Sequence, residues 1–120
     1  MSMSKETVRE KLKDLNMVVL NVLPESDYAK IHILGSKSLP IGLNSGDFVE
    51  AVEKSYGKDK SFITYCAGLT CNAGPEAAKA LRDKGFKAND YPGGMKEWSD
   101  AGFAVEGNEV KGASFTAASK

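Results

Sequence analysis

The sequence is poor in several residue types, and each scarcity excludes a class of protein. Only two of its 120 residues are cysteine, too few for the disulfide framework of a small secreted domain. Sixteen basic and sixteen acidic residues balance, which argues against binding to nucleic acid or to an anionic membrane. No apolar run approaches the length of a membrane span. The N-terminal residues lack a hydrophobic signal region, so we expect a cytoplasmic protein in a reducing compartment.

Strand-like apolar runs alternate with helix-like spacing of apolar residues along the chain. The expected strands are 17–23, 61–65 and 88–91, with a short extended piece at 37–40, and the expected helices are 4–15, 24–29, 48–56, 75–84 and 95–101. The first run, M-V-V-L-N-V-L, is typical of a strand buried on both faces. The alternation predicts an α/β fold in which helices flank both faces of a central parallel sheet. In such sheets, ligands bind beyond the carboxyl ends of the strands.

Two details of the helices can be predicted from single residues. Ser4 is expected to cap the first helix, whose face of Val8, Leu12 and Leu15 should pack on the core. Docking of a partner protein on that face is the alternative, but the apolar stripe is narrow. Gly57 is expected to end the helix 48–56 in the left-handed conformation, and Asn44 lies in the turn that precedes it.

The stretch Ser61–Asn72, S-F-I-T-Y-C-A-G-L-T-C-N, carries the candidate chemistry. Its strand delivers Cys66 to the carboxyl end, where a loop of mostly small residues leads to a helix that opens around Pro75. The free N–H groups and the positive end of that helix favour negative charge, a setting that lowers the pKa of a thiol. Cys66 is therefore the predicted nucleophile. The alternative is that it serves as a small buried hydrophobic residue.

Two reactions suit a thiolate held in a loop of backbone N–H groups. One is attack on the outer sulfur of thiosulfate or of a persulfide, which leaves a persulfide on Cys66. The other is attack on a phosphate ester, which normally requires an arginine to hold the phosphoryl oxygens. Neither arginine nor lysine occurs between Cys66 and Lys79, so the phosphatase interpretation is disfavoured. The predicted anion-binding loop consists of Ala67, Gly68, Leu69, Thr70, Cys71 and Asn72, acting through their backbone groups.

Cys71 and the single histidine leave alternatives open. Cys71 either resolves a persulfide on Cys66, releasing sulfide and leaving a disulfide, or is an inert loop residue. His32 is interpreted as a structural hydrogen-bonding residue, with a role as general base or ligand as the alternative. Two cysteines and one distant histidine fall short of a zinc site, so we predict no metal and no cofactor.

An ordered set of segments resembles the single-domain rhodanese-like (thiosulfate sulfurtransferase) family. The segments are N-V-L-P-E-S-D-Y-A at Asn21–Ala29, H-I-L-G-S at His32–Ser36, T-Y-C at Thr64–Cys66, A-A-K-A-L at Ala77–Leu81, G-F at Gly85–Phe86 and G-G-M-K-E-W-S-D-A-G-F at Gly93–Phe103. The resemblance implies a central parallel sheet, Cys66 as the persulfide-forming residue, and residues 67–72 as the loop that binds the anion. It implies structural roles for Gly94 and Trp98.

The resemblance also sets the expected domain boundaries and partners. Residues 17–106 form the rhodanese-like domain, residues 1–16 add an amphipathic helix to it, and residues 107–120 are expected to form a flexible tail. The implied partner is a small sulfur-containing anion or a protein that carries a persulfide, and the sequence does not fix the oligomeric state. The cysteine loop contains no arginine, unlike the common Cys-Arg-x-Gly-x-Arg form. A non-catalytic binding or redox-sensing module that uses Cys66 and Cys71 is therefore the second interpretation.

Overall fold

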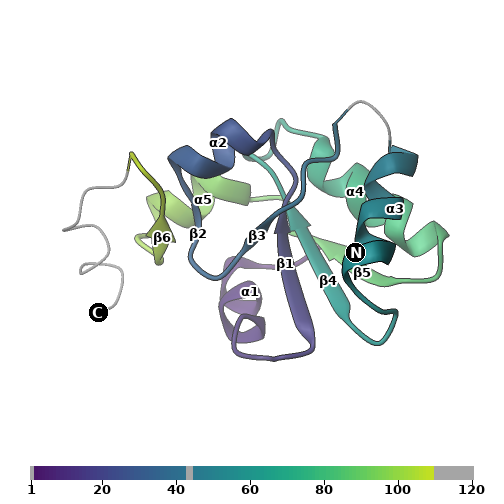
Figure 1. Cartoon of the computed structure of the whole chain (residues 1–120). Helices are drawn as coiled ribbons and strands as arrows, with labels where there is room; N and C mark the ends of the chain where they lie inside the picture. The colour runs from purple at the N-terminus through teal and green to yellow at the C-terminus, as the bar shows by residue number, and fades with distance from the viewer. Residues whose placement is uncertain (1, 43–44, 110–120) are drawn as a thin grey trace.

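A parallel sheet of four strands forms the middle layer of the molecule (Figure 1). The computed structural model describes residues 2–42 and 45–109. The strand order is β3-β1-β4-β5, with β1 at Met17–Asn21, β3 at Lys37–Ser38, β4 at Ser61–Tyr65 and β5 at Lys87–Asp90. All three pairings are parallel, and the register places Leu20 beside Thr64 and Thr64 beside Asp90. The carboxyl ends of β1 and β4 therefore lie side by side.

Helices cover both faces of this sheet, which confirms the predicted fold class. The helices are α1 at Lys5–Lys11, α2 at Glu25–Lys30, α3 at Ser45–Ser55, α4 at Ala73–Asp83 and α5 at Gly94–Asp100. One hydrophobic cluster joins α3 and α4 to the sheet and includes Phe62 and Cys66. The cluster on the other face joins α1 and α5 to the sheet and includes Tyr65 and Trp98. Alternate residues of β4 thus enter different cores, as the period of a strand requires.

A second, two-stranded sheet lies beside α2. Its strands β2, at His32–Ile33, and β6, at Val105–Glu106, run antiparallel. Neither the pairing nor β6 is predicted by the sequence, since each strand is only two residues long. Beyond β6, the N–H groups of Asn108 and Glu109 donate to the carbonyls of Ala29 and Lys30.

Two expectations about single residues are wrong. Leu15 is 91% exposed, because α1 ends at Lys11 and Leu15 lies in the turn that follows. Gly57 is not among the described glycines with positive φ, since α3 already ends at Ser55 and the Gly57 carbonyl accepts from the N–H of Lys60. Ser4, in contrast, caps α1 as predicted, and its Oγ accepts from the N–H of Thr7.

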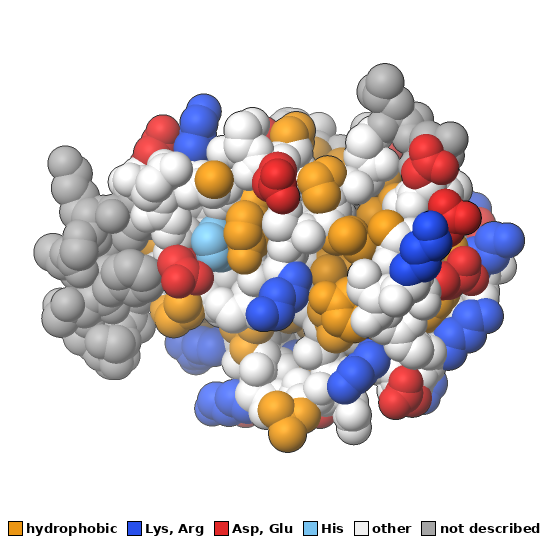
Figure 2. Space-filling model, viewed as in Figure 1, with side chains coloured by type: hydrophobic (Ala, Val, Ile, Leu, Met, Phe, Trp, Pro, Cys, Tyr) orange, Lys and Arg blue, Asp and Glu red, His pale blue; other side chains and the backbone are white. Residues whose placement is uncertain are grey.

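Some expectations concern residues that the structure does not describe. The turn at Asn44 and residues 110–120 of the expected tail lie outside the described residues. No helix within residues 2–42 and 45–109 is long and apolar enough to cross a membrane. On the face of the molecule in Figure 2, basic and acidic side chains lie interspersed, and neither sign of charge gathers into one patch.

Candidate functional site

The N-terminus of α4 packs on the end of β4, where Cys66 follows the strand. The N–H of Gly74 donates to Cys66 Sγ at 3.3 Å, and it is one of the first N–H groups of the helix, which have no partner within it. A Cβ added to Gly74 would lie 3.3 Å from the Cα of Tyr65, so a glycine permits this close approach. The buried Thr64 Oγ1 donates to the carbonyl of Gly74 at 2.6 Å and ties the strand to the helix. The sulfur therefore faces a helix N-terminus, as the sequence predicts.

Cys66 and Cys71 form a disulfide in this structure. Their Cα atoms are 6.4 Å apart, and the N–H of Cys71 donates to the carbonyl of Gly68, which closes a turn between the two cysteines. Cys66 is only 3% exposed, whereas Cys71 is half-buried. Cys66 is thus in its oxidised state here, and the ionised, reachable thiolate remains a prediction for the reduced protein.

The first turn of α5 holds the start of the cysteine loop. The N–H of Met95 donates to the carbonyl of Cys66, and the N–H of Lys96 donates to the carbonyl of Ala67, both at 2.9 Å. Gly94 precedes them with φ +60°, and a Cβ there would lie 2.5 Å from the carbonyl oxygen of Cys66. The sequence indicates a structural role for Gly94 but not this contact. The adjacent glycines at 93 and 94 were the available signal of a close backbone approach.

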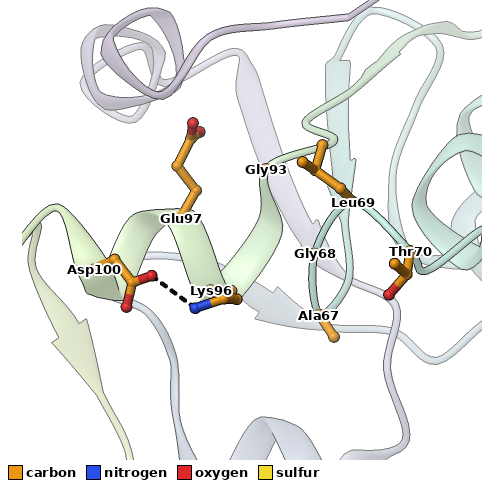
Figure 3. A pocket seen from close by; sticks show the side chains of 8 residues that line it. All are labelled: Ala67, Gly68, Leu69, Thr70, Gly93, Lys96, Glu97 and Asp100. Atoms are coloured by element: carbon orange, nitrogen blue, oxygen red, sulfur yellow. Dashed lines mark hydrogen bonds and ion pairs between the residues drawn. The ribbon is translucent and has the colours of Figure 1, made fainter.

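A cavity of about 510 Å³ lies between the loop and α5 (Figure 3). It is lined by Ala67, Gly68, Leu69, Thr70, Gly93, Lys96, Glu97 and Asp100. Lys96 brings a cation beside a loop that contains none, and its Nζ bonds Asp100 Oδ2 at 2.9 Å in an exposed ion pair. Four of the predicted loop residues line this cavity. Cys66, Cys71 and Asn72 do not, and Cys66 belongs instead to the core on the α4 side.

A buried hydroxyl network supports the strand that ends at Cys66. The Tyr65 hydroxyl accepts from Asn21 Nδ2 at 3.1 Å and from the N–H of Ile33 at 3.0 Å, and it bonds Ser36 Oγ at 2.8 Å. Burial raises the pKa of Tyr65 to about 12. The network joins β1, β2 and β4 through one neutral side chain.

The contacts of His32 agree with a structural role. Its Nδ1 lies 2.7 Å from the carbonyl oxygen of Tyr28, its Nε2 lies 3.0 Å from Glu106 Oε1, and its ring stacks on that of Tyr28. These contacts tie β2 to α2 and β6. Within residues 2–42 and 45–109, no three His, Cys, Asp or Glu side chains gather as a metal would require.

The parallel sheet, with a cysteine at the end of a central strand against a helix N-terminus, defines an α/β domain with one candidate thiol site. The family model described as Rhodanese-like domain matches residues 4–101. The chain belongs to this rhodanese-like domain family, as the resemblance of its segments predicts.

Known proteins similar to this chain include one curated regulator and several solved structures. The HTH-type transcriptional regulator Rv0324 of Mycobacterium tuberculosis is 29% identical over 90 residues, which cover 75% of this chain and 38% of that protein. This chain therefore matches well under half of the regulator's length. The BH2092 protein of Bacillus halodurans is 26% identical, with a TM-score of 0.79 over 90% of this chain and 77% of that one. The Alr3790 protein of Anabaena sp. is 26% identical, with a TM-score of 0.76 over 90% of this chain and 94% of that one.

Replacing Thr64 with valine should lower the reactivity of the Cys66 thiol in the reduced protein, measured as its rate of alkylation. Valine keeps the shape of the side chain but removes the bond to Gly74, which positions the N–H donor for the sulfur. We expect a loss of about 1–2 kcal/mol in the free energy of unfolding, measured with urea. Thr64→Ser, which keeps the hydroxyl, should be alkylated at the wild-type rate. Equal alkylation rates of Cys66 in the two variants would contradict the role given to this bond.

Proposed function

We propose that the reduced protein is a sulfurtransferase that carries a sulfane sulfur as a persulfide on Cys66. The Cys66 thiolate attacks the outer sulfur of thiosulfate, the sulfur–sulfur bond breaks, and sulfite leaves with the bonding electrons. A thiol or cyanide then attacks the terminal sulfur of the persulfide, and the Cys66 thiolate is restored. A persulfide on a carrier protein is the alternative donor.

The observation that carries this proposal is the bond from the N–H of Gly74 to Cys66 Sγ at 3.3 Å. The N–H of Gly74 has no partner within the eleven-residue helix α4, and it stabilises negative charge on Cys66 Sγ in the thiolate. Membership of the rhodanese-like domain family supports the same assignment.

The test is intact-mass spectrometry of the reduced protein after incubation with thiosulfate, and separately with a carrier protein loaded with persulfide. We expect Cys71→Ser to gain one sulfur atom and Cys66→Ser to gain none. Loading of Cys66→Ser would show that the wrong thiol has been named. If neither donor loads Cys71→Ser, the sulfurtransferase proposal is wrong.

A second candidate is a non-catalytic module that binds a partner or senses oxidation. Two observations favour it: the disulfide between Cys66 and Cys71, and the similarity of this chain to part of a protein named as a transcriptional regulator. Titration of the thiols in the reduced protein separates the two candidates. A Cys66 pKa near the free value of about 8.5 would support the module, and a clearly lower pKa would support the enzyme.

The cellular setting proposed for either function is the reducing cytoplasm. In that compartment a disulfide is usually transient and serves catalysis or redox sensing. The pairing of Cys66 with Cys71 suits such a use, because the two cysteines are only five positions apart and close a short loop. The proposed partners are therefore a sulfur donor and a thiol-containing acceptor, and neither nucleic acid nor membrane is among them.

A further inference from the structure

We propose that Cys71 resolves the Cys66 persulfide, so that the protein reduces a sulfane sulfur to sulfide with its own two thiols. This inference rests on the proposed function, because it begins from the loaded persulfide. In this reaction the thiol of Cys71, in the same loop, takes the place of the external thiol or cyanide acceptor. The product would then be free sulfide rather than a persulfide or thiocyanate.

The geometry of the loop supports this step. The Cα atoms of Cys66 and Cys71 are 6.4 Å apart, within the usual range of about 4.4–6.8 Å for a disulfide. The N–H of Cys71 donates to the carbonyl of Gly68, and the turn that this bond closes keeps Cys71 close to Cys66. The backbone of Cys66 and Ala67 is fixed from the other side by α5. A thiol held so near reacts as an intramolecular nucleophile and competes well with acceptors in solution.

The atoms and electrons of this step balance without an external oxidant. The Cys71 thiolate attacks Sγ of the Cys66 persulfide, and a bond forms between the two cysteine sulfurs. The bond from Cys66 Sγ to the terminal sulfur breaks, and hydrosulfide leaves with the electron pair. The two cysteine thiols are oxidised to the disulfide, and the sulfane sulfur is reduced by two electrons to sulfide.

Regeneration of the two thiols requires a dithiol reductant. The exposure of the two cysteines determines which sulfur of the disulfide the reductant attacks first. Cys66 is 3% exposed and Cys71 is half-buried, so an external thiolate reaches Cys71 first. Attack at Cys71 expels the Cys66 thiolate, which the N–H of Gly74 stabilises as a leaving group. The second thiol of the reductant then frees Cys71. The reductant becomes a disulfide, and the Cys66 thiolate is ready for the next donor.

The experiment follows sulfite and sulfide separately in one anaerobic turnover. Wild type, Cys71→Ser and Cys66→Ser are reduced, freed of reductant and mixed with thiosulfate. Lys79→Ala, which changes an exposed ion pair on the outer side of α4, is the control. Sulfite reports loading of Cys66, and sulfide reports resolution. Intact mass distinguishes a gained sulfur atom from the loss of two hydrogen atoms in the disulfide.

We expect wild type and Lys79→Ala to release sulfite and then an equal amount of sulfide, and to end as the disulfide. Cys71→Ser should release sulfite, keep the added sulfur and release no sulfide. When cyanide is added, Cys71→Ser should form more thiocyanate than wild type, because its persulfide is not consumed internally. Adding dithiothreitol should make sulfide release catalytic in wild type.

Two results would overturn the inference in different ways. If wild type loads sulfur but keeps its persulfide as long as Cys71→Ser does, Cys71 does not resolve it, and the proposed sulfurtransferase stands alone. If neither wild type nor Cys71→Ser releases sulfite or gains sulfur, this thiosulfate reaction fails at its first step, and both the inference and its basis in thiosulfate chemistry are rejected.

Discussion

Replacing Gly94 with alanine is expected to lower both the stability of the protein and the loading of sulfur onto Cys66. The new Cβ would lie 2.5 Å from the carbonyl oxygen of Cys66 and 2.8 Å from the amide nitrogen of Gly68. The residue must also keep φ near +60°, which side chains disfavour. Backbone strain and overpacking together should cost about 3 kcal/mol in the free energy of unfolding.

The same substitution should move the cysteine loop, because the clash lies within it. The bonds from Met95 and Lys96 to the loop carbonyls cannot both survive such a shift. Gly102→Ala is the matched control, since Gly102 has φ +78° but a Cβ added there would meet no atom within 4 Å. The control should lose only about 1 kcal/mol and should load normally. Equal losses in the two variants, measured by urea unfolding and by intact mass, would show that the loop contact contributes nothing.

Replacing Tyr65 with phenylalanine is expected to destabilise the protein by about 2–4 kcal/mol. The buried hydroxyl forms hydrogen bonds with Asn21, Ile33 and Ser36. Its loss therefore leaves three polar groups without this partner. Tyr56→Phe is the matched control, because the Tyr56 hydroxyl has no hydrogen bond to the residues that the structure describes. That change should stay within about 0.5 kcal/mol. A similar small effect at position 65 would contradict the role of the network.

The same tyrosine should make stability depend on alkaline pH. Burial raises its pKa from 10.0 to about 12, so the folded protein keeps the proton where the unfolded chain loses it. The stabilising contribution is therefore complete below pH 10.0 and is lost as pH rises through about 12. Tyr91, whose pKa is also raised by burial, shifts stability in the same direction. Tyr65→Phe should flatten the alkaline decline in urea stability without abolishing it.

The parts of the fold that depend on local sequence could be predicted. The apolar run of β4, Pro75 in the first turn of α4, and Gly85 with φ +91° after that helix all act through nearby residues. The position of Cys66 between strand and helix follows from the same patterns. These features need only the periodicity of apolar residues and the conformational preferences of proline and glycine.

Contacts between distant parts of the chain could not be predicted. Gly94 lies against the carbonyl of Cys66. Ile33 pairs with Val105, which is more than seventy positions later in the chain. No local pattern encodes such distances in a single sequence. The prediction for Leu15 was wrong for a related reason: its spacing continues a helical face, but the helix ends at Lys11. The position of Lys96 beside the cysteine loop was not predicted either, because this residue belongs to another helix, α5.

Because the cysteine loop is fixed at both ends, its length sets how far apart its two thiols lie. Cys66 and Ala67 are held by α5, and the chain is held again at Gly74 by Thr64. Between these anchors, Leu69 and Thr70 are exposed. Inserting a spacer of one or two residues between them would part the two thiols while leaving the surroundings of Cys66 intact. Under the proposed mechanism, the spacing of the cysteines, rather than their presence alone, decides whether a captured sulfur is passed on or expelled.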